Sequence, residues 1–243
     1  MTRRLVVLSH PIRADSPVWP TNPPAAVVEL VDSIERGDAD NAARLTLYSH
    51  SGTHVDTPWH FNPDGPAGWQ LPIERFVFDA PRLVDVPAGE RHLIGVEDLE
   101  PHDAAASGAD LLMIRTGWGS LRVTDPRRYA TEGPMLHPDA ARWLIDRHPR
   151  LRAIATDAIS IGAPWTLPLS VETHHVLTGV GRTDGRFILI YEDVRLLPQA
   201  AAAVRVLAWP LAIEGSDGSP VTIVAEVDER DETGDRAAES GAG

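Results

Sequence analysis

Short apolar runs, most of them bounded by Pro, Gly or Asp, recur along the whole chain and predict β-strands. Most of these runs have the length of a single strand and are too short for a transmembrane helix. The expected strands are Leu5–Leu8, Ala26–Val31, Arg44–Tyr48, Arg82–Val86, Leu111–Arg115, Arg152–Ala155, Phe187–Tyr191, Val204–Ile213 and Val221–Val227.

Helical patterns are fewer than strand patterns. Pro138 stands where a helix can begin, so a helix is expected over Ala140–Asp146. Two further helices are predicted over Val96–Ala106 and Ser170–Thr178. In the second, Ser170 is expected to be the N-cap, and Gly179 is expected to end the helix. Because strands outnumber helices and do not alternate with them strictly, the pattern predicts a mixed α/β fold rather than a doubly wound one.

The length of 243 residues suits one larger domain, expected over residues 1–227, followed by an acidic tail over 228–243. Seven acids and two arginines lie between Glu226 and Gly243, and the composition of this stretch is typical of disorder. The formal net charge of −13 argues against a nucleic-acid partner and against anionic membrane surfaces. The apolar run Leu5–Leu8 is too short for the core of a signal peptide, and no stretch has the length of a transmembrane helix, so a cytoplasmic protein is expected.

Two residue types are missing from the sequence, because all 22 basic residues are arginine and there is no cysteine. The absence of lysine excludes Schiff-base chemistry and a phosphate-binding P-loop, and the absence of cysteine excludes a thiolate nucleophile, a thiolate metal site and disulfides. The nucleophile must then be a hydroxyl, a carboxylate, an imidazole or a metal-bound water.

Three histidines and an aspartate, namely His50, His54, Asp56 and His60, fall within eleven residues. In an extended chain His54 and Asp56 share one side, and Gly52 lets the backbone turn so that His50 can return to the same centre. Imidazole nitrogen and carboxylate oxygen suit zinc or manganese in a protein without thiols. The alternative is a histidine-rich turn with no chemistry.

A second polar set lies downstream, with His174 and His175 on a predicted helix and Glu192 and Asp193 just after a predicted strand. These side chains could reach the same cavity, as ligands of a second metal or as partners of the first ligands. The alternative is an exposed histidine pair and an ordinary acidic turn.

Residues 50–60 follow the pattern H-x-G-T-H-x-D-x-P-x-H, and this pattern resembles the signature of the metal-dependent cyclase superfamily. Bacterial kynurenine formamidases and isatin hydrolases belong to that superfamily. The resemblance extends over nearly the whole chain, through Leu8–Ile12, Ser16–Pro20, Leu112–Thr116, Thr156-Asp157, Pro210–Gly215 and Asp217–Val221. It implies a swivelling β/β/α fold and a homodimer.

The resemblance also implies a role for individual residues. His50, His54 and Asp56 are expected to bind one metal, with Asp56 bridging to a second ion whose other ligands are His174 and Glu192. His60 is expected to act as the acid/base residue, and Trp19 to contact the ring of the substrate, with Trp59 as a further candidate. One or two Zn²⁺ ions are expected as the cofactor, with Mn²⁺ as an alternative.

One departure from the formamidase pattern concerns the second set of ligands. More residues separate His174 from Glu192 in the sequence than separate the corresponding histidine and glutamate of the formamidases. An insertion around Arg182–Arg186 would explain the difference. The choice between His174 and His175 is therefore open, and His-x-x-Leu favours His174.

The expected activity is hydrolysis of N-formyl-L-kynurenine to L-kynurenine and formate, a reaction of tryptophan catabolism. Metal-activated water would attack the amide while His60 protonates the departing nitrogen. The nearest rival is hydrolysis of a cyclic amide such as isatin. A non-catalytic metal- or ligand-binding member of the fold is an alternative of another class, and the lack of a G-x-S-x-G motif argues against a serine hydrolase.

Overall fold

A computed structural model describes residues 3–228 of the chain. Its centre is a six-stranded sheet in which the four strands β11, β10, β8 and β6 run parallel, while β4 runs antiparallel to both β11 and β13. In spatial order the strands are β13 (Gly218–Pro220), β4 (His54–Asp56), β11 (Leu189–Glu192), β10 (Ala153–Thr156), β8 (Leu111–Arg115) and β6 (Pro81–Asp85).

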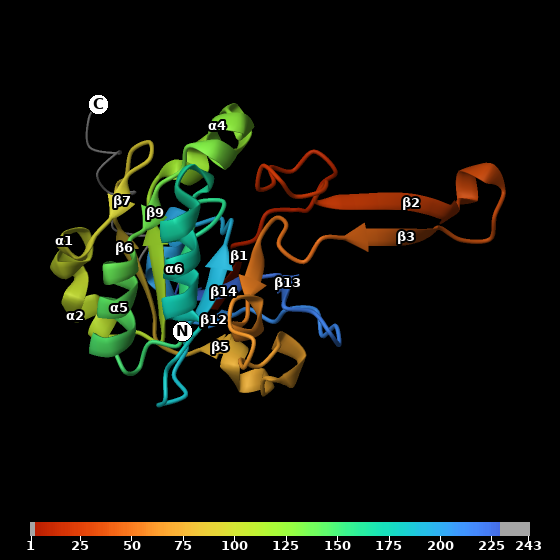
Figure 1. Ribbon diagram of the computed structural model, residues 1–243. Coiled ribbons are helices and arrows are strands. Elements are labelled where there is room, and N and C mark those ends of the chain that lie inside the picture. Colours follow the sequence, from red (N-terminus) through yellow and green to blue (C-terminus); the bar gives the residue numbers. More distant parts are fainter. Residues whose placement is uncertain (1–2, 229–243) are drawn as a thin grey trace, which may run out of the picture.

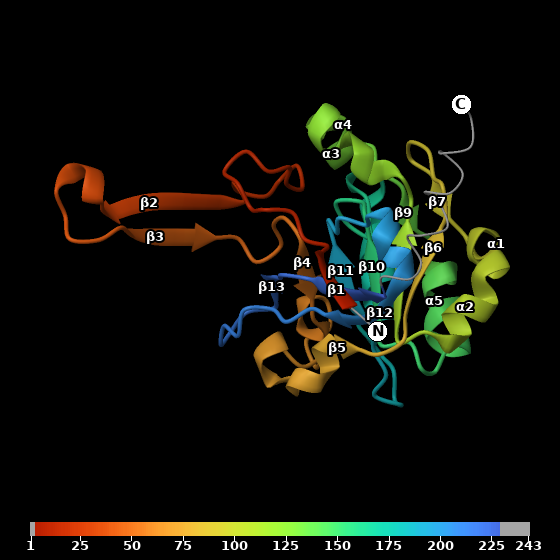
Figure 2. The same ribbon diagram turned by 180° about the vertical axis from the view of Figure 1, so that it is seen from behind.

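A four-stranded antiparallel sheet packs on one face of the central sheet (Figures 1 and 2). In spatial order it contains β1 (Arg3–Val7), β14 (Val224–Asp228), β12 (Ala203–Leu207) and β5 (Val77–Phe78). The first and last described strands, β1 and β14, are neighbours, with Arg3 opposite Asp228.

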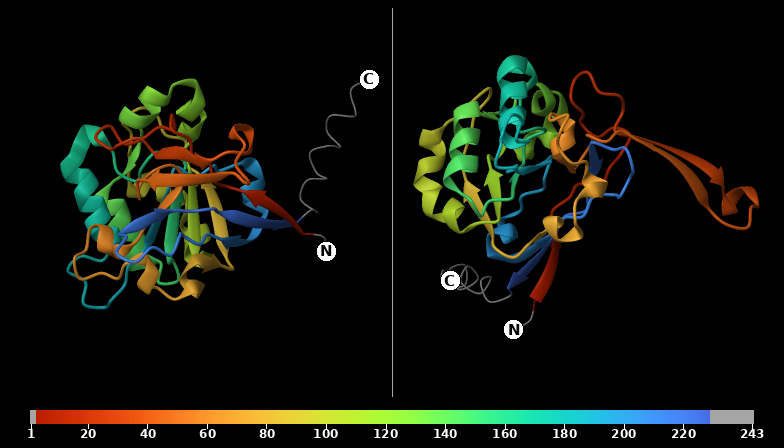
Figure 3. Two further views of the ribbon diagram at one scale, coloured as in Figure 1. Left: turned by 90° about the vertical axis from the view of Figure 1, so that its right-hand side faces the viewer. Right: turned by 60° about the horizontal axis from the view of Figure 1, so that its bottom comes forward.

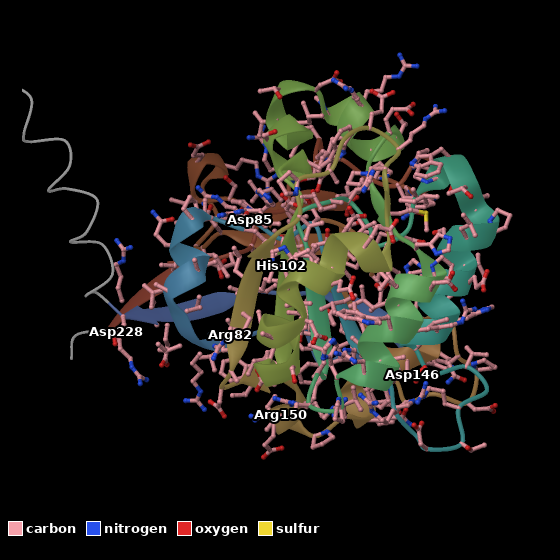
Figure 4. The ribbon with its side chains drawn as sticks, turned by 90° about the vertical axis from the view of Figure 1, so that its left-hand side faces the viewer. Arg82, Asp85, His102, Asp146, Arg150 and Asp228 are labelled. Carbon is pink, nitrogen blue, oxygen red and sulfur yellow. The ribbon has the colours of Figure 1, made fainter. Side chains whose placement is uncertain are left out.

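Helices cover the other face of the central sheet, as the two views in Figure 3 show. They are α1 (Val96–Leu99), α2 (Asp103–Gly108), α5 (Pro138–Arg147) and α6 (Leu167–Leu177). Figure 4 views the molecule from the side of the helices. His102 and Asp146 lie in the helical layer, and Asp228 lies at the left edge of this view. The short helices α3 (Leu121–Thr124) and α4 (Pro126–Thr131) lie at one end of the molecule, and β7 (Leu93–Ile94) pairs with β9 (Met135–Leu136).

Single turns of 3₁₀-helix fill many of the connections. They are Ile34–Arg36, Pro58–His60, Gly68–Gln70, Ile73–Phe76, Glu100–His102, Trp118–Ser120, Pro164–Thr166 and Pro198–Ala202.

The side chains of β8 explain why the three layers form. Leu111 and Met113 point into the apolar core between the two sheets, while Leu112 and Ile114 point into the core under the helices. A strand that is buried on both faces carries a continuous apolar run, because successive side chains alternate between the two faces. The mixed α/β class and the β/β/α layering expected from the sequence are confirmed.

A two-stranded arm projects from the body of the molecule (Figures 1 and 3). It consists of β2 (Ala26–Asp32) and β3 (Ala42–Leu47), paired antiparallel. The arm ends just before the histidine motif, so the motif follows an arm strand and not a strand of the central sheet. His54–Asp56 forms a central strand of its own, which the sequence did not predict.

Two predicted helices differ from the observed ones. The segment Val96–Ala106 is helical but is divided at Pro101, where a 3₁₀ turn separates α1 from α2, because proline lacks the N–H of a helix interior. The later helix begins at Leu167, so Thr166 and not Ser170 occupies its N-cap position. Pro168 in the first turn favours this earlier start.

The strand expected over Val204–Ile213 ends at Leu207, and the remaining residues form a loop with one isolated bridge at Pro210. At the C-terminal end, Asp228 still belongs to β14, one residue beyond the predicted domain boundary. The rest of the predicted acidic tail, 229–243, lies outside the described residues. Among residues 3–228 no helix is both long and apolar enough to cross a membrane.

Candidate metal centre

Three structural elements bring the expected ligands together. His54 and Asp56 lie on β4, Glu192 ends β11 directly opposite His54, and His174 lies on α6. Residues that face each other across a strand pair share one side of the sheet, as do residues two apart in one strand. His50 precedes β4, and Gly52, with φ +62°, turns the backbone between them.

The three histidines surround the carboxylates of Asp56 and Glu192. His54 Nε2 lies 3.4 Å from Asp56 Oδ1 and 3.3 Å from Glu192 Oε2. His174 Nε2 lies 3.7 Å from Asp56 Oδ2 and 3.6 Å from Glu192 Oε1. His50 Nδ1 lies 2.8 Å from Asp56 Oδ1. Asp56 therefore contacts all three histidines, which is the position expected of a bridging ligand.

The tautomers of His54 and His174 fit a metal ion. Nδ1 of His54 is 2.7 Å from the carbonyl oxygen of Gly52, and Nδ1 of His174 is 2.7 Å from that of Ser170. A carbonyl can only accept, so each Nδ1 donates and each Nε2 turns to the carboxylates. Within the described residues the buried Nε2 of His54 makes no hydrogen bond. A divalent cation would satisfy this nitrogen and offset the two buried negative charges.

The electrostatics of the centre keep both carboxylates ionised. Burial opposes ionisation of Asp56, but the neighbouring His60 and His50 hold its pKa well below the usual value. Burial and the charge of Asp56 act against ionisation of Glu192, yet the neighbouring His174 and His54 lower its pKa to about 2. The centre, called the cradle below, therefore consists of two ionised carboxylates, Asp56 and Glu192, surrounded by the imidazole nitrogens of His50, His54 and His174.

Asp217 joins His60 to His50, a link that the sequence did not suggest. Its Oδ2 lies 2.8 Å from His60 Nδ1 and 2.9 Å from His50 Nε2, and the two rings stack with centroids 3.8 Å apart. Burial alone would lower the pKa of His50, but Asp56 and Asp217 raise it to about 9. His60 is thus oriented by a carboxylate and leaves Nε2 as the ring nitrogen available for proton transfer.

Sequence reasoning also missed two side chains that hold the ligands. The hydroxyl of Ser160 donates to Glu192 Oε1 at 2.8 Å, and the ring of Phe61 stacks on that of His174 with centroids 4.4 Å apart. Asp217 lies 167 residues from His50, so local spacing could not connect the two. Its one signal was its place in a segment that resembles the superfamily.

A pocket opens from the centre, and its lining places the remaining candidates. Trp19, Tyr48 and Phe61 line it together with the expected ligands and His60. Trp59 does not line this pocket and is 42% exposed, so the expectation that it contacts the substrate is not supported. His175 also lies outside the lining.

Comparisons with known proteins agree with this geometry. The family model described as putative cyclase matches residues 6–163. The kynurenine formamidase of Bacillus cereus is 31% identical over 226 residues, which cover 92% of this chain and 97% of the relative. The kynurenine formamidase of Bacillus anthracis is 30% identical over the same shares.

Solved structures share the fold. Isatin hydrolase A from Labrenzia aggregata superposes with a TM-score of 0.78 at 24% identity, covering 93% of this chain and 94% of that one. A potential metal-dependent hydrolase with cyclase activity superposes with a TM-score of 0.70 at 21% identity, covering 94% and 100%.

Site and relatives together define a hydrolase whose side chains could hold a metal ion. Within that class, the chain belongs to the cyclase family, as the resemblance of its histidine motif implied.

Proposed function

We propose that this amide hydrolase cleaves N-formyl-L-kynurenine to L-kynurenine and formate. The kynurenine formamidases among its relatives support this substrate, since the match covers nearly their whole length. The observation that carries the proposal is the group of possible metal ligands around Asp56, which lines the same pocket as His60 and the aromatic side chains of Trp19, Tyr48 and Phe61. Ligands for a cation, a proton donor and an aromatic wall are the parts that hydrolysis of an aryl amide requires.

Each part has a proposed role. His50, His54, Asp56, His174 and Glu192 would hold one or two divalent ions, Zn²⁺ or Mn²⁺ by the chemistry of the donors. A divalent ion in such a cradle polarises a carbonyl and lowers the pKa of a bound water to about 7.

His60 would give a proton to the departing aryl nitrogen, because the free anilide anion is a poor leaving group. Its contact with Asp217 holds the ring in one orientation. Trp19 would pack against the aromatic ring of the substrate.

The first experiment compares two substrates. Protein loaded with Zn²⁺ or Mn²⁺ is expected to release formate from N-formyl-L-kynurenine, and protein stripped by a chelator is expected to lose this activity. Turnover of isatin alone would favour the cyclic-amide alternative, and turnover of neither substrate contradicts both. Absence of bound metal in elemental analysis would favour a non-catalytic binding protein.

We also propose that the protein is a homodimer joined through the β2–β3 arm. Val28, Leu30 and Leu45 are 63%, 52% and 59% exposed, and they lie on one face because Val28 pairs with Leu45. A two-stranded hairpin is only marginally stable alone in water, so an arm with an apolar face needs a partner surface. A second copy of the chain meets this need in the homodimer that the superfamily resemblance implies.

Light scattering should therefore give twice the 26.4 kDa mass of one chain. Leu45→Glu is expected to shift the protein to the monomer, because a charge would have to be buried in the interface. Val123→Glu, a matched change of an 82% exposed residue on α3, is expected to leave the dimer intact. A monomeric native protein would contradict the proposal.

A further inference from the structure

A buried ion pair ties α3 to the end of β11, next to the metal centre. Arg122 donates from Nε and Nη2 to the two carboxylate oxygens of Asp193, each 2.7 Å away. Tyr129 of α4 donates its hydroxyl to Asp193 Oδ1 at 2.6 Å. The side chains of Arg122 and Asp193 are 8% and 2% exposed, and Tyr129 is fully buried. Asp193 is thus clamped by the two short helices at one end of the molecule (Figure 2).

The backbone of Asp193 links two chain segments that carry expected ligands. Asp193 directly follows Glu192, and its carbonyl oxygen accepts a 2.6 Å hydrogen bond from the hydroxyl of Thr53, which directly precedes His54. Its φ is +51°, in the left-handed region that non-glycine residues rarely adopt. The chain therefore adopts an uncommon backbone conformation at the point where the two expected ligand-bearing segments meet.

Stability alone does not account for this arrangement. The cost of removing two charges from water often exceeds their mutual attraction, and apolar residues of similar size often serve a protein core equally well. Backbone strain persists where the surroundings fix it, and it gathers at functional sites. Asp193 combines an uncommon backbone conformation with a buried charge pair and contacts both Glu192's strand end and the turn before His54, so the arrangement is better explained by the placement that it imposes.

We propose that Asp193, held by Arg122 and Tyr129, is a positioning residue of the metal centre. It fixes the end of β11 against the turn before β4, so that Glu192 and His54 face each other at the spacing a cation needs. Arg122 and Tyr129 act through Asp193 and touch neither the ion nor the substrate. The proposal rests on the metal site of the proposed function, so its test measures metal affinity separately from activity.

The test compares three variants by competition titration of Zn²⁺ against a chromophoric chelator. Asp193→Asn combined with Arg122→Gln removes both charges together, and asparagine tolerates the left-handed backbone. Tyr129→Phe removes only the hydroxyl, which contacts Asp193 Oδ1 and, at 3.2 Å, the carbonyl oxygen of Asp157, and it is the milder change. The control is Asp85→Asn combined with Arg115→Gln, which breaks a bidentate pair with distances of 2.5 and 2.8 Å at the surface (Asp85 in Figure 4).

Loss of a partner that orients metal ligands typically weakens metal binding about 10–100-fold, and we expect this range for the Asp193/Arg122 double variant. Tyr129→Phe should weaken binding less, and the surface control should leave the affinity unchanged. Tyr129→Phe decides the question if the double variant does not fold.

Thermal unfolding of each metal-free variant distinguishes positioning from stability. A folded variant with lowered Tm but the Zn²⁺ affinity of the native protein would make the cluster a purely structural element and overturn the proposal. If the native protein itself binds no metal, the proposed function fails first. Weakened Zn²⁺ binding in a variant that unfolds at the native temperature supports the positioning role most directly.

Discussion

Replacing His60 with alanine should lower kcat of the metal-loaded protein about 10²–10⁴-fold, the range typical of removing a general acid or base. His60 lines the pocket, and Asp217 holds its Nδ1 at 2.8 Å. Without the imidazole, the departing nitrogen would have to leave as an anion. Metal content, measured by elemental analysis, should stay at the native level, since the ligands of the cradle remain.

A matched control for this variant is His102→Ala, a change on the helical face away from the pocket (Figure 4). It should retain native kcat. A His60→Ala protein with a near-native rate would remove His60 from the mechanism. Loss of metal would instead make His60 a ligand, since one group of possible ligand atoms contains His50, Asp56 and His60.

Asp56→Asn should have the larger effect on the metal itself. Both groups of possible ligand atoms include Asp56, and its carboxylate contacts His50, His54 and His174. An amide keeps the shape of the side chain but removes the negative charge, so the affinity loss should exceed the roughly 10–100-fold typical of outer partners. Activity should fall to the level of the metal-free protein.

Titration with Zn²⁺ and elemental analysis measure this loss directly. Asp64→Asn is the matched control, because Asp64 is an exposed residue in the loop that follows the motif. It should bind metal as the native protein does. Native metal affinity in Asp56→Asn would contradict the bridging role of Asp56.

Strands made of apolar residues were predicted from the sequence, whereas the strand that carries polar site residues was not. The strand Leu111–Arg115 was predicted to the residue, because a strand covered on both faces is an uninterrupted apolar run. The strand His54–Asp56 was not predicted, since two of its three residues are polar and line the pocket at the candidate metal centre. The pattern of apolar residues along the sequence predicts strands that are buried in an apolar core. It does not predict a strand whose polar side chains are buried at a functional site.

In the candidate site, residues close together in the sequence were predicted to share a centre, whereas contacts between distant segments were not predicted. The spacing of His50, His54 and Asp56 suggested a shared centre, because a short extended segment and one turn determine where they point. The pattern left open whether His174 and Glu192 bind a second metal or support the first ligands, and the superfamily resemblance favoured the first of these roles. Asp217 and the Arg122–Asp193 pair depend on the tertiary arrangement of distant segments, which no spacing along the chain encodes.

The order of strands in the central sheet has a consequence for folding. The short strand β4 lies between β11 and β13, which come from parts of the chain more than a hundred residues away. Such non-local pairing must overcome loop-closure entropy before it gains any contact, and it slows folding. The candidate metal site is therefore complete only after β11 and β13 have paired with β4, so metal binding would report completed folding. At an ion concentration of 100 times Kd, selective binding to the folded chain stabilises it by about 2.7 kcal/mol.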